Sequence, residues 1–583
     1  LALALRRPAP ARPSVRHGKG AAGGGGSGAV VSRRAMAARA AAEDRRRFFE
    51  AAARGRSGKG NLVPMWECIV SDHLTPVLAY RCLVPDEDDV EAPSFLFESV
   101  EQGPDKGAAH LGRYSIVGAR PAMEVVARER GNVTFTDHET GQVTETVDVD
   151  DPMRVPQSIM EEWRPQKLNK DDELPDCFCG GWVGFFSYDT VRYAENRKLP
   201  FSSAPHDDRG LPDLHLGLYD DVVVFRPRRE ESVRRPLGEP GPPRVRRGRV
   251  PGRQVAAERS ALQIAQLERA RAFSGNREAA DTPLNESSMT SHEYKSAVVK
   301  AKEHIMAGDV FQVVLSQRFE RRTRATPFEV YRALRIVNPS PYMAYVQARG
   351  CVLVASSPEI LTRVSSNGKI INRSLAGTVR RGRTEEEDEA REQELLNDEK
   401  QRAEHTMLVD LARNDVGKVS KPGTVKVEKL MDVERYSHVS STVTGQLDDR
   451  RLRSSSSWDA LPVGTVSGAP KVRAMELIDE LEVTRRGPYG GGFGGISFDG
   501  DMQVALTLRT IVFPTAPCRD DATCCSFGEG DGRRRREWVA HLQAGPGIVA
   551  GSVPEDEQRE CENKAAALAR AIDLAESAFV YKE

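Results

Sequence analysis

The residues best suited to catalysis form an acidic turn near the C-terminus. Glu557 and Glu560 are three residues apart, follow a turn that contains Gly545 and Gly547, and come after Ser552, the expected N-cap of a helix. Positions i and i+3 share one helix face, so the two carboxylates could hold Mg²⁺, which keeps several waters and takes few protein ligands. By itself, however, this spacing is better explained by a solvated acidic first turn that the helix dipole favours.

Four further segments change that interpretation. An acidic helix is expected over residues 385–410 and contains Glu404, and the other segments read Leu-Ala-Gly-Thr at 375–378, Pro-Val-Gly-Thr at 462–465 and Asn-Pro-Ser-Pro-Tyr-Met at 338–343. In this order, and with the C-terminal turn and helix, they resemble the chorismate-utilising enzymes, and most closely the plant-type large subunit, component I, of anthranilate synthase. The resemblance covers roughly residues 61–225 and 285–583.

Composition sets wide limits that agree with such an enzyme. The formal net charge of the 583 residues is −1, so no global basic field favours a nucleic-acid partner. No apolar run reaches the ~20 residues that a membrane-spanning helix needs. The nine cysteines lack paired, regular spacing, which argues against a disulfide framework. We therefore expect neither a nucleic acid nor a membrane as a partner.

The N-terminal segment differs from the rest of the chain. Its first 42 residues contain no Asp or Glu and are rich in Arg and Ala, as in an organelle transit peptide. The plant-like resemblance makes the chloroplast stroma the expected destination, and translated upstream sequence is the alternative. We expect residues 1–60 to be a disordered leader that lies outside the fold.

Apolar periodicity predicts a mixture of strands and helices. Strands are expected over residues 76–84, 94–101, 180–188 and 221–225, and helices over residues 291–306, 327–336, 385–410, 472–481 and 554–579. The elements follow no regular βαβ repeat, which favours an α+β fold with largely antiparallel sheets. The resemblance implies an antiparallel β-sandwich surrounded by helices, with a regulatory, tryptophan-binding domain (61–225), a linker or aberrant insert (226–284) and a chorismate-binding catalytic domain (285–583).

The resemblance also implies a reaction and a site. The enzyme would convert chorismate and ammonia to anthranilate and pyruvate, the first committed step of tryptophan biosynthesis. Glu359 would be the general acid for the leaving hydroxyl, and Mg²⁺ would bind Glu404 and Glu560, with Glu557 close by. The remaining substrate-binding residues implied by the family are Tyr489 and Arg509 for the enolpyruvyl carboxylate, and Gly377, Thr378, Thr465, Gly545, Gly547 and Lys564. Thr465 also belongs to the implied catalytic set.

His438 is the candidate for the catalytic histidine of the family. Residues 435–445 are three residues shorter than the family pattern, in which two histidines flank the missing piece. Counting back from residue 445 gives His438 the catalytic position, whereas counting forward from residue 435 makes it the other histidine. The first alignment is favoured because the following strand fixes the face that each side chain occupies.

Two positions indicate the nucleophile. Relatives that use water carry a lysine where this chain has Gln312, and relatives that make 4-aminobenzoate carry a lysine where it has Ala376. An amide and a methyl group cannot activate water or attack the ring, so ammonia is the expected nucleophile. The sequence contains no Gly-x-Cys-x-Gly elbow, so a separate glutamine amidotransferase small subunit, component II, is expected as the partner.

Two segments resemble the halves of the family's inhibitory tryptophan pocket. One contains Glu98 and Ser99, and the other contains Asn338, Pro341, Tyr342 and Met343. Without the resemblance, a strand edge and a rigid turn would explain them. Residues 226–253, 450–462 and 518–532 depart from the family pattern. The alternative is therefore a non-catalytic or mis-spliced relative that only binds tryptophan or the partner subunit.

Overall fold

The structure is a computed structural model. It describes residues 2–5, 62, 66–69, 71, 73–85, 89–99, 114–163, 165, 178–225, 286–378, parts of 384–397, and 397–434, 438–448, 466–515 and 535–580. The predicted linker, 226–284, and the departing segments 450–462 and 518–532 lie outside the described residues.

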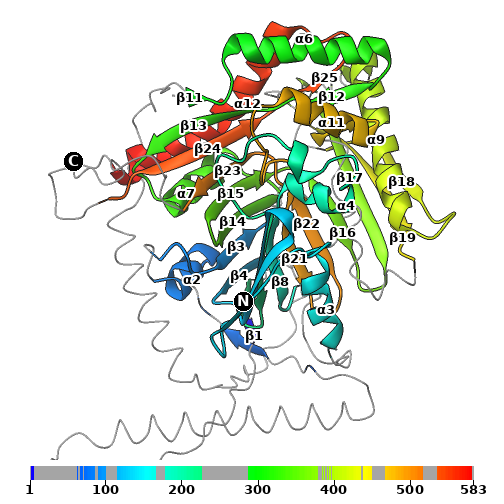
Figure 1. Ribbon diagram of the computed structural model, residues 1–583. Coiled ribbons are helices and arrows are strands. Elements are labelled where there is room, and N and C mark those ends of the chain that lie inside the picture. Colours follow the sequence, from blue (N-terminus) through cyan, green and yellow to red (C-terminus); the bar gives the residue numbers. More distant parts are fainter. Residues whose placement is uncertain are drawn as a thin grey trace, which may run out of the picture.

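Two large antiparallel sheets form the body of the protein (Figure 1). The first has eleven strands in the order β11 (Glu286–Ser287), β13 (Gln317–Thr323), β24 (Trp538–Ala544), β23 (Thr510–Pro514), β15 (Cys351–Ser357), β14 (Tyr342–Ala348), β3 (Ser94–Glu98), β4 (Ser115–Ala119), β10 (Val222–Phe225), β1 (Ala2–Leu5) and β2 (Trp66–Ile69). The second also has eleven strands, in the order β18 (Lys426–Glu434), β19 (His438–Gln446), β17 (Lys369–Thr378), β16 (Ile360–Val364), β22 (Met502–Leu506), β21 (Gly492–Ser497), β8 (Gly181–Phe186), β9 (Leu214–Tyr219), β5 (Met123–Arg128), β6 (Asn132–Asp137) and β7 (Gln142–Thr146).

The two sheets pack against each other through apolar side chains. Phe185 and Phe493 of the second sheet meet Val346 and Leu353 of the first in one buried cluster. A small third sheet, β20 (Gly468–Ala469), β12 (Gln312–Val314) and β25 (Gly547–Ile548), joins loops that are distant in the sequence. The architecture is therefore an antiparallel sandwich of the α+β class.

Helices cover the outer faces of the sandwich. α6 (Ser291–Ala307), α7 (Pro327–Val337) and α12 (Pro554–Ala575) bury apolar side chains on the first sheet together with α2 (Pro76–Leu83) and α11 (Lys471–Leu481). α9 (Glu399–Val419) packs on the second sheet. The remaining helical segments are α3 (Arg154–Glu162), α4 (Val191–Ala194), η2 (Glu129–Gly131), η3 (Tyr188–Thr190), η4 (Phe201–Ser203) and the π-helical turn Glu576–Val580. Among the described residues, no helix combines the length and apolar character needed to cross a membrane.

Most predicted elements are confirmed. α6, α7, α11 and α12 agree closely with the expected helices, and β3, β8 and β10 with three expected strands. α6 and α7 begin with capping boxes, in which Thr290 and Glu293, or Thr326 and Glu329, bond each other's backbone. The acidic helix is described from Glu399 and runs beyond its predicted end to Val419.

Two local predictions are wrong. The strand expected over residues 76–84 is α2, because the Thr75 hydroxyl accepts the N–H of Leu78 and Pro76 suits the first turn. Ser552 does not cap α12, because its hydroxyl accepts the N–H of Val549 at 3.0 Å. Inside the predicted leader, Ala2–Leu5 pairs with β10 and β2 as β1, and the assignment of residues 1–60 as a leader stays a prediction.

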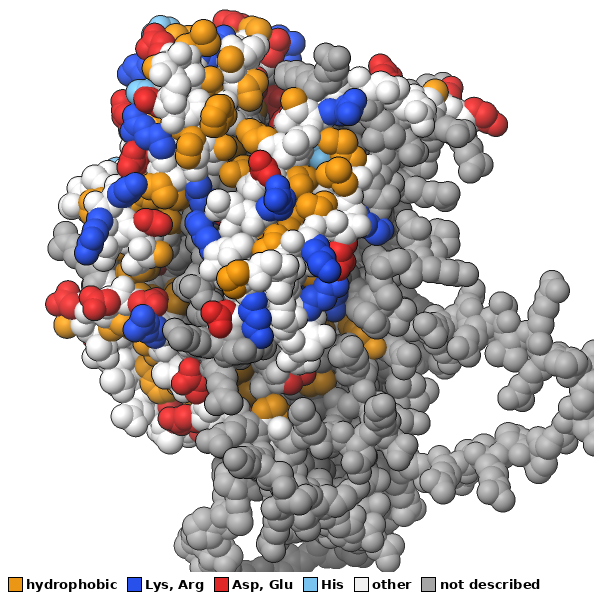
Figure 2. All heavy atoms as spheres, turned by 90° about the vertical axis from the view of Figure 1, so that its right-hand side faces the viewer, with side chains coloured by type: hydrophobic (Ala, Val, Ile, Leu, Met, Phe, Trp, Pro, Cys, Tyr) orange, Lys and Arg blue, Asp and Glu red, His pale blue; other side chains and the backbone are white. Residues whose placement is uncertain are grey.

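The ranges 61–225 and 285–583 build the same two sheets. In the first sheet β3 pairs with β14, and in the second β8 pairs with β21. The division into a regulatory and a catalytic domain stays a prediction, but the two ranges share a continuous core. On the face shown in Figure 2, acidic and basic side chains of the described residues are mixed, in keeping with the net charge of −1.

Candidate active site

Glu359 lies in the turn between β15 and β16, and its side chain is buried. The backbone N–H of Leu375 donates a hydrogen bond to its carboxyl group. Burial nevertheless raises the pKa of Glu359 to about 8, because the charged form loses its hydration. The carboxyl group is therefore mostly protonated at neutral pH, which is the state that a general acid requires.

Three further predicted residues lie at the end of the β17–β19 pair, close in sequence or pairing to Leu375. Leu375 is followed by Gly377 and Thr378, where the pairing of β17 with β19 becomes irregular. Thr378 lies opposite His438 in this pairing, so the backbone of His438 is at the same end of the sheet as Glu359. The side chains of Thr378 and His438, and all of Thr465, lie outside the described residues, so their roles stay predictions.

Arg509 occupies the turn between β22 and β23 with a backbone φ of +49°. A positive φ is unfavourable for a residue with a Cβ, and such strain concentrates at functional sites. Burial lowers the pKa of Arg509, and electrostatic interactions with the nearby Tyr489 and Glu560 oppose this shift. The fold thus brings together Arg509, Tyr489 and Glu560, three residues that the sequence placed in one site.

The C-terminal glycine turn is held closely against neighbouring elements. A Cβ on Gly545 would lie 2.3 Å from the carbonyl oxygen of Leu315, and a Cβ on Gly547 would lie 2.0 Å from Nε2 of Gln312. Lys564 Nζ donates to the carbonyl oxygen of Gly545 at 3.1 Å and lies 2.7 Å from Oε1 of Glu560. The turn, α12 and the buried Gln312 are therefore one connected arrangement, in which only glycine permits the observed backbone approach.

The predicted metal ligands lie on two helices. Glu557 and Glu560 are in the N-terminal turns of α12, and Glu404 is half-buried on α9. The next residue, His405, is buried with Nε2 2.6 Å from the hydroxyl oxygen of Ser441, which fixes α9 against β19. In the described part of the chain, no cluster of three or more His, Cys, Asp or Glu side chains is found. A few carboxylates completed by water and substrate are nevertheless the donor set that suits Mg²⁺, so the chemistry of these side chains fits the ion, and their assignment as ligands stays a prediction.

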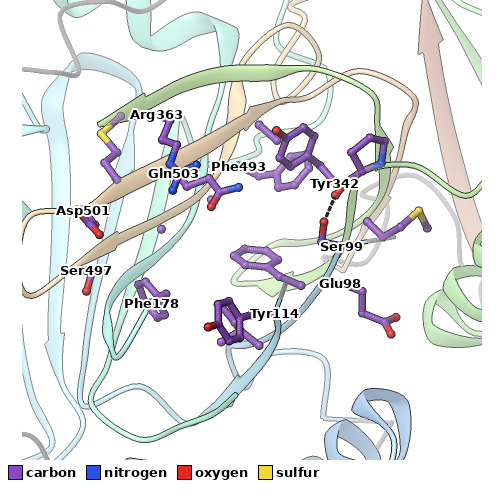
Figure 3. A pocket seen from close by; sticks show the side chains of 18 of the residues that line it. Glu98, Ser99, Tyr114, Phe178, Tyr342, Arg363, Phe493, Ser497, Asp501 and Gln503 are labelled. Carbon is purple, nitrogen blue, oxygen red and sulfur yellow. Dashed lines mark hydrogen bonds between the residues drawn. The ribbon is translucent and has the colours of Figure 1, made fainter. Parts of the chain in front are cut away.

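A cavity of about 150 Å³ lies between the two sheets (Figure 3). Of the six residues predicted for the tryptophan pocket, Glu98, Ser99, Pro341, Tyr342 and Met343 line it, and Asn338 does not. The hydroxyl of Ser99 donates to the carbonyl oxygen of Pro341 at 2.9 Å, and Met343 lies opposite Glu98 in the pairing of β14 with β3. Two segments that are far apart in the sequence therefore form one wall.

The Glu98 carboxylate is already bound by groups on α7. Tyr331 Oη donates to its Oε2 atom at 2.6 Å, and Arg335 Nε lies 2.7 Å from the same atom. In Figure 3 this carboxylate points away from the cavity. Through these two contacts, the Glu98 side chain connects β3 to α7.

The opposite wall was not predicted from the sequence. It includes Arg363 on β16, Gln503 on β22 and Phe493 on β21, all from the second sheet. Burial raises the pKa of Tyr342 to about 12, so its hydroxyl stays neutral, with Arg373 and Arg363 nearby. No local pattern marks these residues, because only the packing of the two sheets brings them to the cavity.

Comparison with known proteins supports the family that the sequence motifs predict. Residues 118–570 match the family described as chorismate binding enzyme. The chain is 67% identical to anthranilate synthase alpha subunit 2, chloroplastic, of Oryza sativa subsp. japonica, over 92% of this chain and 87% of that protein. It is 61% identical to anthranilate synthase alpha subunit 1, chloroplastic, of Arabidopsis thaliana, over 90% of this chain and 87% of that protein.

A solved structure has the same fold. Anthranilate synthase component I from Streptococcus pneumoniae TIGR4 superposes with a TM-score of 0.56 and 32% identity, covering 86% of this chain and 99% of that one. The chain belongs to the chorismate-binding enzyme family. Its plant relatives given above are both anthranilate synthase alpha subunits, which confirms the predicted resemblance, the fold class and the chloroplast localisation.

Proposed function

We propose that the chain is the large subunit of an anthranilate synthase, which converts chorismate and ammonia into anthranilate and pyruvate in tryptophan biosynthesis. Identities of 61–67% to plant alpha subunits support this function. The structural observation that carries the proposal is the buried, protonated carboxyl of Glu359 beside the end of β17. The reaction must expel a poor leaving group, a hydroxyl, and an acid at that place supplies the required proton.

Substrate binding requires donors for two carboxylates. Arg509 has the planar, forked guanidinium that matches a carboxylate, and Tyr489 lies near it. Gly545 and Gly547 would let backbone groups approach the ligand, and Lys564 donates a hydrogen bond to the Gly545 carbonyl oxygen. The other donors that we assign to the substrate are Gly377, Thr378 and Thr465.

The first chemical step exchanges a hydroxyl for an amine. Glu359 gives its proton to the C4 oxygen of chorismate while ammonia adds at C2, so the C4–O bond breaks and water leaves. Loss of the C2 proton and of the enolpyruvyl group as pyruvate then makes the ring aromatic. His438 and Thr465 complete the catalytic set that we propose.

The nucleophile must arrive as ammonia. Gln312 is 5% exposed and lies beside Gly547, and its neutral amide cannot deprotonate water. Ala376 likewise offers no amine. A glutamine amidotransferase small subunit is therefore the proposed ammonia source.

Glu404 and Glu560 would hold Mg²⁺, with Glu557 close by. When bound, the ion supplies a Lewis-acid charge that draws electron density from the ring. Lys564 already neutralises part of the Glu560 charge through their 2.7 Å ion pair, and this contact orients the carboxylate within α12.

The cavity between the sheets is the proposed tryptophan site. Its aromatic lining suits a planar apolar ring, and Arg363 offers a cation for a carboxylate. Ser99, Pro341, Tyr342 and Met343 would contact the inhibitor, while Glu98 and Asn338 support the wall. Because this cavity is separate from Glu359 and Arg509, inhibition would act through two conformational states.

A direct assay tests the function. The purified chain should form a fluorescent aromatic amine from chorismate, ammonium and Mg²⁺, and Glu359→Gln should reduce the rate at least a hundredfold. If the chain binds tryptophan but forms no amine, the alternative of a non-catalytic or mis-spliced relative is correct. That alternative is suggested by the departures at residues 226–253, 450–462 and 518–532.

A further inference from the structure

Ser357 is fully buried, and its hydroxyl group is next to the proposed general acid. Oγ of Ser357 lies 2.6 Å from the carbonyl oxygen of Leu506 and 3.2 Å from the carbonyl oxygen of Glu359, so its proton faces both acceptors. The same oxygen accepts the N–H of Glu359 at 3.4 Å. The N–H of Leu506 donates to the carbonyl oxygen of Glu359 at 3.0 Å. One hydroxyl thus ties the turn that carries Glu359 to β22.

The same serine borders the wall of the cavity. In the pairing of β14 with β15, Ser357 lies opposite Tyr342, which lines the cavity. Ala505, the residue before Leu506, also lines it. A displacement of Tyr342 or Ala505 therefore reaches the Ser357 hydroxyl through directly adjacent residues, and a well-packed core transmits such displacements.

The neighbouring Ser356 provides a comparison. It is also buried and lies on the same strand, but its hydroxyl donates to the carbonyl oxygen of Asn338. Among the described residues, the Ser356 hydroxyl donates to Asn338 and not to Glu359, and the N–H of Ser356 donates to the carbonyl oxygen of Arg509 at 3.1 Å. The two serines are therefore similar in burial and chemistry, and they differ in the carbonyl groups to which their hydroxyls donate.

We propose that Ser357 is a positioning residue that holds the Glu359 turn in its reactive geometry, and that a ligand in the cavity inhibits the enzyme by disturbing this contact. The inference rests on the proposed function, because it takes Glu359 as the general acid. Among the described residues, burial and the Leu375 N–H are the influences on the protonation of Glu359. A looser turn would admit water and favour the charged form of the carboxyl group.

The test compares Ser357→Ala with Ser356→Ala in the full chain. For Ser357→Ala we expect kcat to fall tenfold or more with KM within about threefold. The basic limb of its pH–rate profile should move to lower pH. Tryptophan should bind with unchanged affinity in equilibrium dialysis but inhibit less. Ser356→Ala should keep the wild-type pH profile.

A second variant distinguishes a positioning role of Ser357 from misfolding of the Ser357→Ala variant. Ser357→Cys keeps the shape of the side chain with a small increase in volume and retains a weak donor, so its kcat should lie between those of Ser357→Ala and wild type. A uniform loss of activity with unchanged pH profile and unchanged inhibition would show a structural role only and overturn the inference. A wild-type rate in Glu359→Gln would instead refute the proposed acid. An inactive Glu359→Gln with a normal Ser357→Ala would refute the positioning role alone.

Discussion

The hydroxyl of Ser99 donates a 2.9 Å hydrogen bond to the carbonyl oxygen of Pro341, a residue 242 positions further along the chain. Both residues line the cavity between the sheets, where Figure 3 shows the hydrogen bond as a dashed line. It joins the end of β3 to the start of β14, the strand that is paired with β15 and so with the turn of Glu359. The cavity wall is therefore connected to the turn of Glu359 through neighbouring, paired strands.

Replacing Ser99 by Leu should relieve inhibition by tryptophan. The larger side chain would occupy part of the cavity and remove the bond to Pro341, while Glu359 and Arg509 remain untouched. We expect the tryptophan concentration for half-inhibition to rise at least tenfold and the uninhibited rate to change less than twofold. Ser203→Leu is a matched control, because Ser203 also donates to a proline carbonyl but lies exposed on η4. If millimolar tryptophan does not inhibit the unmodified chain, the regulatory proposal is wrong.

Replacing Glu404 or Glu560 by Gln should abolish Mg²⁺-dependent turnover. Each change removes a carboxylate charge but little volume, so the circular dichroism spectrum and melting temperature should stay near wild type. Glu562→Gln is the control, since Glu562 is an exposed carboxylate on α12, the helix that carries Glu560. Activity is measured across a Mg²⁺ titration. Full activity of either variant at saturating Mg²⁺ would remove that residue from the metal site.

Replacing Gly545 by Ala should weaken chorismate binding. The new Cβ would lie 2.3 Å from the Leu315 carbonyl oxygen, so the backbone of the turn must move. A loss of about 1.4 kcal/mol corresponds to a tenfold change in affinity, and we expect KM to rise by at least that factor. Gly551→Ala is the control, because a Cβ there meets nothing within 4 Å. Equal KM values for the two variants would show that the turn does not contact the substrate.

Glu359→Gln should stabilise the protein at alkaline pH. Its ordinary pKa is 4.5 and its pKa in the fold is about 8, so the folded state binds more protons than the unfolded state between these values. The free energy of unfolding therefore falls as pH rises through this window, by up to about 1.4 kcal/mol per unit. Glutamine stays neutral and avoids this loss.

Urea denaturation checks this expectation. The variant and the wild type should be similarly stable near about pH 4, and the variant should be more stable near about pH 8. In the active wild type, kcat/KM should fall on the basic side near the same pH, because the acid form is lost. An equal pH dependence of stability in both proteins would contradict the raised pKa.

The sequence by itself determined the family, the α+β class and most helices. The capping boxes at Thr290 and Thr326 link residues three positions apart, so they need no tertiary structure to form. The family motifs pointed to Glu359, Arg509 and the glycine turn, and the fold brings Arg509 close to Glu560 on the helix that follows this turn.

Tertiary structure alone decided features that depend on distant residues. The apolar segment Pro76–Leu83 fits either a strand or a helix by its composition, and its cap and packing made it α2. The raised pKa of Glu359 arises from its burial between elements, and the positive φ of Arg509 is a feature of the folded turn between β22 and β23. The second wall of the cavity, with Arg363 and Gln503, exists only because the two sheets stack. Local hydrogen bonding can be read along a sequence, whereas burial and sheet packing bring together residues whose separation along the chain carries no signal.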